Sequence, residues 1–101
     1  MNPQQDVVNT PVADDALIER NPELFFTDMD GELVMMSVAR GEYFGLGGIA
    51  PRLWALLETP RTPRFLRETV LAEFDVDEPT CLRDVAEFIA NMIAKDLARA
   101  R

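Results

Sequence analysis

Few residues in this chain have the types and spacing that could do chemistry. Cys81 is the single cysteine, the pair Asp14–Asp15 could hold a cation weakly, and the run Gly45-x-Gly47-Gly48 could approach a phosphate. The chain contains no histidine, which excludes a histidine-based triad and an HExxH zinc site. The glycine run lacks the Lys-Ser/Thr of a phosphate loop, and the acidic pair lacks EF-hand spacing. We therefore expect no catalytic residue, no metal site and no cofactor.

Composition favours a small binding protein. The chain has 101 residues, 48% of them hydrophobic and 28% charged, which suits one packed domain. It has no apolar run long enough to span a membrane, and a lone cysteine fits a reducing cytoplasm. Ten basic residues stand against 18 acidic ones, a net charge of −8. Because this charge repels phosphate backbones, we expect neither a nucleic-acid nor a membrane partner, but a neutral or basic one.

The residues that could take part in chemistry are positioned by the two halves of the chain, of which the first is rich in strands and the second is helical. Strands are predicted over residues 23–29, 33–38 and 42–46. Asp30-Gly31 marks a tight hairpin turn, because a type I′ turn needs positive φ at both central residues. In the second strand the even positions Val34, Met36 and Val38 are apolar, which predicts that this face is buried. Residues 1–21 are predicted to be a flexible lead-in, and residues 22–101 the domain.

Three helices are predicted to follow the sheet. Trp54 is expected to anchor the first helix in the core. Thr62-Pro63 has the pattern of an N-cap followed by proline at the first helical position, which begins the second helix. The third helix opens at Glu78-Pro79 and is predicted to continue to about Ala98. The order β-β-β-α-α-α predicts an α+β domain with a three-stranded antiparallel sheet beneath three helices.

The third helix carries more apolar residues than a single contact with the sheet needs. We expect one row to pack on the core and a second row to line a groove beside Phe44. The core row is Leu82, Ile89 and Ile93, and the groove row is Val85, Phe88 and Met92. For any single residue of the stripe, ordinary core packing is the main alternative.

Two segments resemble the PqqD-like family. One is RGEYFGLGGIAPRLWALL at residues 40–57, a glycine turn and an aromatic strand that lead into a Trp-containing helix. The other is DVAEFI at residues 84–89. The resemblance covers residues 23–98, although Gly47 stands where many relatives have Asn. It implies a winged helix-turn-helix-like fold and the role of a RiPP recognition element, a domain that binds the leader of a ribosomally made precursor peptide.

In that family the leader is held as an added strand beside the third strand, in a groove walled by the third helix, and is delivered to a modifying enzyme. The resemblance thus implies a leader peptide and an enzyme such as a radical SAM protein, a protease or a cyclase as partners. The open edge of a meander supports strand addition on physical grounds, and it would also allow a homodimer. The expected peptide-binding residues are Glu42, Tyr43, Phe44, Gly45, Leu46, Val85, Phe88, Ile89 and Met92.

A winged-helix transcriptional regulator is the alternative. Arg61, Arg64 and Arg67 form a basic row at helical spacing, which is the kind of surface that contacts DNA. The same row would also arise on a solvated helix face that balances nearby glutamates.

Overall fold

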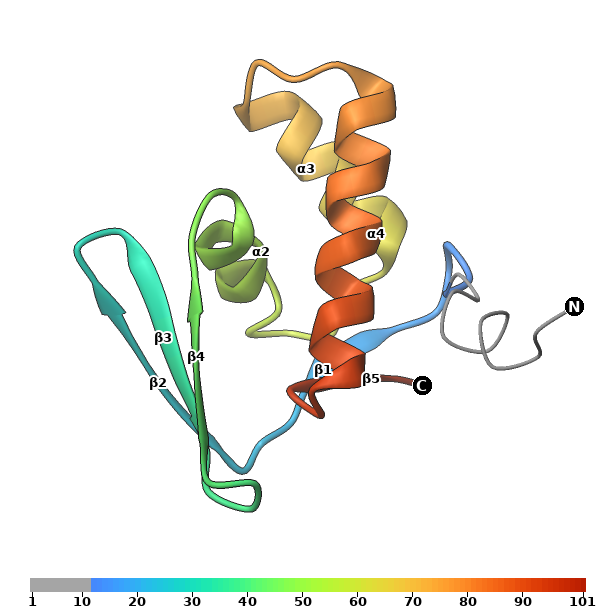
Figure 1. Ribbon diagram of the computed structural model, residues 1–101. Coiled ribbons are helices and arrows are strands. Elements are labelled where there is room, and N and C mark those ends of the chain that lie inside the picture. The colour runs from blue at the N-terminus through green and yellow to red at the C-terminus, as the bar shows by residue number, and fades with distance from the viewer. Residues whose placement is uncertain (1–11) are drawn as a thin grey trace, which may run out of the picture.

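The structure, a computed structural model, describes residues 12–101 and places a three-stranded antiparallel sheet beside a helical body (Figure 1). The strands are β2 (Leu24–Met29), β3 (Glu32–Ser37) and β4 (Glu42–Leu46), hydrogen-bonded in the order β2-β3-β4. We call this sheet the wing. The helices α2 (Ala50–Leu56), α3 (Pro63–Glu73) and α4 (Glu78–Ala94) follow it. The predicted α+β order is confirmed, with a second, small sheet added to it.

Turn chemistry sets the register of the wing. Asp30 and Gly31 both have positive φ, +56° and +81°, as a type I′ turn requires. The predicted hairpin is therefore confirmed. At the second turn Gly41 has φ +63°, and its N–H donates to the carbonyl of Ser37 at 2.8 Å. These turns pair Met35 with both Phe26 and Phe44.

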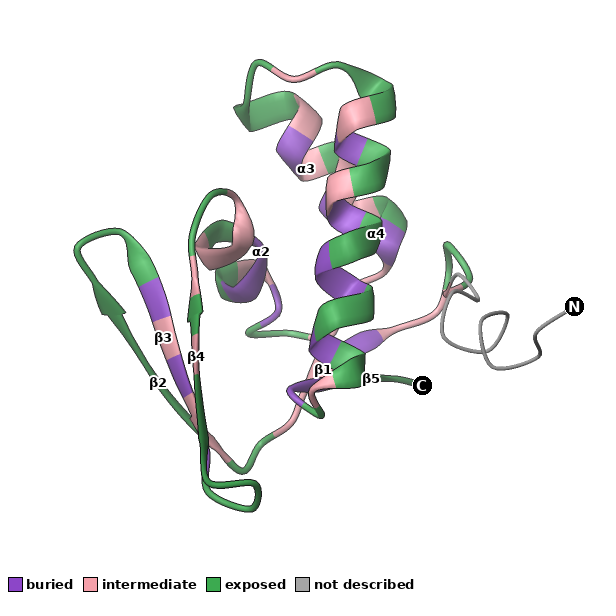
Figure 2. Ribbon diagram, in the orientation of Figure 1, coloured by how far each residue is buried: buried purple, intermediate pink, exposed green. Residues whose placement is uncertain are grey.

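The buried face of β3 is the opposite of the predicted one. Leu33, Met35 and Ser37 are buried, whereas Val38 is 60% exposed and the side chains of Val34 and Met36 are only partly covered (Figure 2). The odd positions face α2 and the core. The prediction was wrong because it placed the polar residue Ser37 on the solvent face. Ser37 is buried, and its hydroxyl accepts a hydrogen bond from the N–H of Arg40 at 3.3 Å.

The helices begin where the sequence predicts. The Thr62 hydroxyl accepts a hydrogen bond from the N–H of Phe65 at 3.0 Å, with Pro63 at the first helical position. Asp77 is the N-cap of α4, and Pro79 lies in its first turn. Both caps satisfy backbone donors that a helix start leaves open.

The C-terminal segment does not continue α4, and the prediction of a helix to Ala98 was wrong. Lys95 is the C-cap and Asp96 has φ +60°, which ends the helix. The chain then forms β5 (Ala98–Ala100), antiparallel to β1 (Ile18–Arg20). Pairing with a distant strand has overridden the good helix propensity of this segment.

Strand β1 makes part of the predicted lead-in a member of the domain. Ile18 is fully buried, and on the side away from β5 it exchanges two backbone hydrogen bonds with Arg61, at 2.7 and 3.1 Å. The packed domain thus begins before residue 22. Residues 1–11, which the prediction also assigned to the lead-in, lie outside the described residues.

The core lies between β3, the three helices and the small sheet. Its largest member is Trp54, 2% exposed, which confirms the predicted anchor, and its ring meets Phe26 edge-on with centroids 5.5 Å apart. The Arg20 guanidinium lies 4.6 Å from the Trp54 ring and 4.9 Å from the Phe26 ring. It also donates to the carbonyl of Trp54. Arg20 therefore joins β1, α2 and the wing. Among the described residues no helix is long and apolar enough to cross a membrane.

Candidate functional site

The outer edge of β4 is the most distinctive feature of the wing. β4 pairs with β3 on one side, and no strand of residues 12–101 pairs with it on the other. In an antiparallel pair every second residue of an edge strand directs its N–H and C=O away from its neighbour. A strand of five residues thus offers about four to six unpaired backbone groups to a guest strand.

The inward face of β4 packs against the body. Phe44 and Leu46 are half-buried against the core. The Lys95 ammonium lies 5.5 Å from the centroid of the Phe44 ring, so the C-terminal end of α4 is in contact with β4. Glu42, at the start of the strand, forms an ion pair with Arg40 at 2.8 Å.

The outward face of β4 is open to solvent. Tyr43 is 74% exposed, and Gly45 is exposed beside it. The glycine does not relieve crowding, because a methyl group added there would make only an ordinary contact, 3.6 Å from the Glu32 carboxylate. Tyr43 and Gly45 therefore contribute backbone groups to the free edge of β4, and they form part of the outward surface of the wing.

The predicted groove row of α4 lies in the core. Val85 and Met92 are each 1% exposed, and Phe88 is 7% exposed. Ile89 is buried beside them, whereas Leu82 and Ile93 of the predicted core row are 53% and 36% exposed. The assignment of the two rows was therefore wrong. An amphipathic helix buries the centre of its apolar stripe, and here Leu82 and Ile93 lie on a margin that neither the sheet nor α3 covers.

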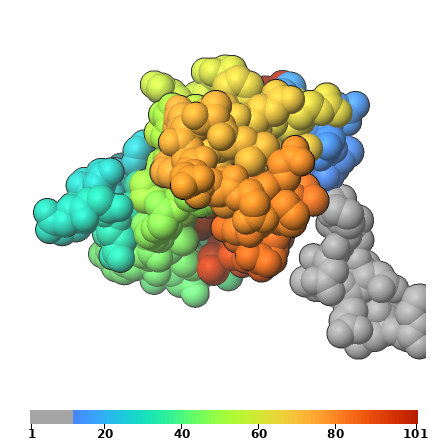
Figure 3. Space-filling model, turned by 90° about the horizontal axis from the view of Figure 1, so that it is seen from above, coloured from blue at the N-terminus to red at the C-terminus, as the bar shows by residue number. Residues whose placement is uncertain are grey.

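A mixed polar flank of α4 lies beside β4. Residues three, four, seven, eight and eleven positions apart share a helix face, so the contact of Lys95 with Phe44 places Asn91, Phe88 and Asp84 on the same side. Asp84 and Lys95 are partly covered and Asn91 is exposed. We call the space between this flank and the edge of β4 the β4–α4 groove. The space-filling view from above shows a hollow between the green and orange parts of the surface, with red C-terminal residues at its floor (Figure 3).

Sequence reasoning missed Asp84, Asn91 and Lys95 as wall residues because it considered only apolar positions. Helical spacing from Phe88 could have found Asp84 and Asn91. Lys95 could not have been found in this way, because its role depends on where α4 ends.

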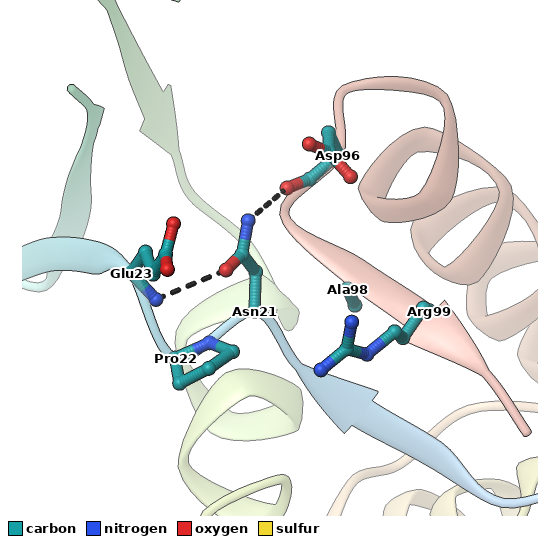
Figure 4. A pocket seen from close by; sticks show the side chains of 6 residues that line it. All are labelled: Asn21, Pro22, Glu23, Asp96, Ala98 and Arg99. Atoms are coloured by element: carbon teal, nitrogen blue, oxygen red, sulfur yellow. Dashed lines mark hydrogen bonds between the residues drawn. The ribbon is translucent and has the colours of Figure 1, made fainter. Parts of the chain in front are cut away.

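A hydrogen-bonded junction at the base of the wing joins the start of β2 to the end of α4. The Asn21 side-chain amide donates to the carbonyl of Asp96 at 2.9 Å, and its oxygen accepts from the N–H of Glu23 at 2.9 Å (Figure 4). These residues, with Pro22, Ala98 and Arg99, line a shallow pocket of about 250 Å³. Because Asn21 bonds the end of α4 to the start of β2, we expect it to act as a positioning residue for the β4–α4 groove.

Cys81 has the environment of a structural thiol. It is 1% exposed, and its Sγ donates to the carbonyl of Arg67 at 3.6 Å. Burial raises the pKa of the thiol, which disfavours the nucleophilic thiolate. No group of three or more metal-ligating side chains occurs in the described part of the chain.

The basic row begins at Arg61, just before α3, and continues into that helix, and most of it is occupied by contacts within the domain. Arg67 forms a two-pronged ion pair with Asp14, with both N···O distances at 2.8 Å, and this hydrogen bonding lowers the pKa of the Asp14 carboxyl. The Arg61 guanidinium lies 4.3 Å from the centroid of the Phe65 ring. Only Arg64 of the three is exposed. This arrangement leaves little of the cationic face that the DNA-binding alternative requires.

The chain is similar to one known protein family and to two solved structures. The family described as Coenzyme PQQ synthesis protein D (PqqD) matches residues 32–98. The solved structure "TbiB1 in Complex with the TbiA(beta) Leader Peptide" is 31% identical with a TM-score of 0.73, covering 80% of this chain and 94% of that one. "Lasso peptide synthetase B1 complexed with the leader peptide" is 22% identical with a TM-score of 0.69, covering 81% and 96%, a likeness in fold. No curated protein gives a significant match.

Proposed function

Because the chain belongs to the PqqD family, we propose that it is an adaptor that binds the leader of a ribosomally made precursor peptide and presents it to a modifying enzyme. The similar structures named above are complexes with leader peptides. The proposed adaptor performs no chemistry itself and acts in the cytoplasm. The enzyme it serves belongs to a class that modifies peptides, such as radical SAM proteins, proteases or cyclases.

The observation that carries this proposal is the unpaired outer edge of β4 beside α4. An extended peptide can satisfy the free N–H and C=O groups of Glu42–Leu46, which gives affinity with little demand on sequence. Side chains on the inward face of the guest strand would enter the β4–α4 groove. The chain would thereby bind a peptide without folding around it.

The wall of the groove supplies selectivity in this proposal. Phe44, Leu46 and the margin of Phe88 offer apolar contacts, while Asp84 and Lys95 offer one charge of each sign. Three of the peptide-binding residues expected from the sequence lie in the core beneath the wall of the groove: Val85, Ile89 and Met92. They are too deeply buried to touch a guest, and they fix the position of the wall.

The test compares proline substitutions on the two edges of the wing. Tyr43→Pro and Phe44→Pro remove adjacent N–H groups, of which one faces the free edge and the other pairs with β3. We expect the variant that loses the edge-facing N–H to stay folded and to bind the leader at least tenfold more weakly by calorimetry, the leader being that of the precursor encoded nearby. Phe26→Pro and Thr27→Pro on β2 are the matched controls, and the one that stays folded should keep its affinity.

Amide exchange of the wild-type protein keeps the test decisive if a proline prevents folding. Leader binding should slow exchange of N–H groups within Glu42–Leu46 and leave Leu24–Met29 unchanged. Full leader affinity in every folded β4 variant, or protection on β2 instead of β4, would contradict the proposal.

A further inference from the structure

Strand addition alone does not determine which residue of a guest lies opposite which residue of β4. The free edge of Glu42–Leu46 offers backbone groups, and the same hydrogen bonds form again when the guest slides by two residues. Side chains therefore have to set the register. Those in a position to do so lie on the inward face of β4 and on the flank of α4 beside it.

The inward face of β4 presents three different environments in succession. Glu42, Phe44 and Leu46 share this face, because their partners on β3 are the buried odd positions of that strand. Glu42 is already paired with Arg40 at 2.8 Å. The Lys95 ammonium lies 5.5 Å from the centroid of the Phe44 ring, and Leu46 is apolar and half-buried. Along this face a guest therefore meets a neutralised acid, a cation and an apolar side chain.

The cation in the middle of this series is without an acidic partner of its own. Lys95 is the only lysine of the chain. Six of the nine arginines form ion pairs with carboxylates, whereas Lys95 forms none with any residue of 12–101. Its side chain is partly covered, which reduces the screening of its charge by solvent. In a chain of net charge −8, this arrangement leaves a positive charge at the groove that a guest carboxylate can pair with.

A guest residue opposite Phe44 would meet this charge. Residues directly opposite each other share a face of the sheet and have Cβ atoms about 4.5–5.5 Å apart, so an Asp or Glu side chain at this position comes within reach of the Lys95 ammonium. It can then form a charge-assisted hydrogen bond. Two residues away the same carboxylate would lie opposite the Glu42 carboxylate or the apolar Leu46. Neither stabilises a negative charge, so a slipped register is disfavoured.

We propose that Lys95 determines the register of the bound leader by pairing with an acidic leader residue opposite Phe44. This inference rests on the proposed function and deepens it, because it names the chemical class of one leader residue. A leader held in a single register presents the same length of peptide to the modifying enzyme in every complex. Backbone pairing with β4 supplies affinity, and Lys95 supplies the alignment that backbone pairing lacks.

The first test is a double-mutant cycle measured by calorimetry. The probe is the leader of the precursor encoded nearby, with each of its acidic residues changed in turn to the amide. Lys95→Gln should weaken leader binding about threefold or more. One leader amide should cause a similar loss in the wild-type adaptor and little further loss in Lys95→Gln. Arg64→Gln, at an exposed arginine of α3, is the matched control for the loss of one positive charge and should leave affinity within about twofold.

The second test measures the register itself. A nitroxide label at a fixed leader residue broadens the NMR signals of the nearest amides in Glu42–Leu46. Exchanging the coupled leader acid with the residue two positions along should move the most strongly broadened amide by two residues in the wild-type adaptor. In Lys95→Gln the broadening should extend over several amides, because the leader then occupies more than one register. The wild-type measurement needs no adaptor variant, so it decides the question even if Lys95→Gln folds poorly.

Two results would overturn the inference while leader binding by the wild-type protein leaves the proposed function intact. One is a cycle in which no leader acid couples to Lys95, and the other is a register that stays unchanged when the acid is moved. Failure of the wild-type protein to bind the leader would remove the proposed function, and the inference with it.

Discussion

The molecule contains two antiparallel sheets, and they differ in how their edges end. In the small sheet, β1 is bonded on both sides, to β5 and to the backbone of Arg61. Its rim is joined by ion pairs of Glu19 with Arg99 and Arg101, each at 3.0 Å. In the wing, β4 is bonded on one side within the described residues, and the outward face carries exposed aromatic side chains.

From this difference we expect the small sheet to contribute mainly to the stability of the fold and the wing mainly to peptide binding. The small sheet packs β1 and β5 against the helices and contributes the buried residues Ile18 and Ala98 to the core. The wing contributes only one face of β3 and parts of its neighbours. An edge strand left unpaired is a liability that proteins normally block, so the open state of β4 is consistent with selection for a partner.

The largest expected effect comes from opening the closed sheet. Ile18→Ala removes a fully buried side chain between β5 and Arg61, and we expect it to lower the free energy of unfolding by about 2–5 kcal/mol. Val38→Ala, at a residue 60% exposed on the wing, should change it by less than about 0.5 kcal/mol. Urea denaturation checks both. Equal losses would show that the wing is as closely packed as the small sheet.

Loosening the junction between the two regions comes next. Asn21→Ala removes two hydrogen bonds at about 0.5–1.5 kcal/mol each, so we expect a loss of about 1–3 kcal/mol in the free energy of unfolding. Leader affinity should fall as well, because the wing and α4 are no longer held at one angle. Asn91→Ala, at an exposed position on α4, should leave stability nearly unchanged. Normal leader affinity in Asn21→Ala would remove its positioning role.

Two glycines of the wing should respond with opposite signs. Gly45→Ala should raise the free energy of unfolding by about 0.5 kcal/mol, because a strand glycine loses more backbone entropy on folding than alanine. Gly41→Ala should lower it by about 1 kcal/mol, because Gly41 has φ +63°, which disfavours a Cβ. Thermal unfolding measures both. A Gly45→Ala variant that is more stable but binds leader poorly would indicate close approach of the guest strand.

The smallest effect concerns the pH dependence of the closed sheet. Hydrogen bonds from Arg101 and Arg99 lower the pKa of the Glu19 carboxyl from 4.5. Such a carboxylate stabilises the fold above its ordinary pKa and loses that contribution as the pH falls through the lowered value. Glu19→Gln should therefore be slightly less stable at pH 7 and should lose less stability below about pH 4.5. A parallel acid profile for both proteins would contradict this role.

Local chemistry made several elements predictable from the sequence. Asp30-Gly31 can adopt positive φ at both positions, and Thr62-Pro63 is typical of a helix start, so the hairpin and the start of α3 follow from neighbouring residues alone. The same holds for the edge strand 42–46, which a glycine turn and a glycine pair delimit. These signals depend on at most a few consecutive residues.

The remaining features depend on contacts between distant residues. In 33–38 every position except Ser37 is apolar, so alternation could not identify the buried face, and packing of Leu33 and Met35 against α2 decided it. The segment 98–100 has helical propensity but forms β5 because β1 offers it a partner 80 residues away. The flank of α4 beside β4 likewise became clear only from the contact between Lys95 and Phe44.

The antiparallel pairing of Ile18–Arg20 with Ala98–Ala100 also makes the domain transplantable. The chain enters and leaves the packed unit at adjacent points, on the side of the body away from the wing (Figure 1). A surface loop of a larger enzyme could therefore accept residues 12–101 through two short connectors. Such a fusion would carry its own capture module at high local concentration, without covering the free edge of β4, where we propose that the peptide binds.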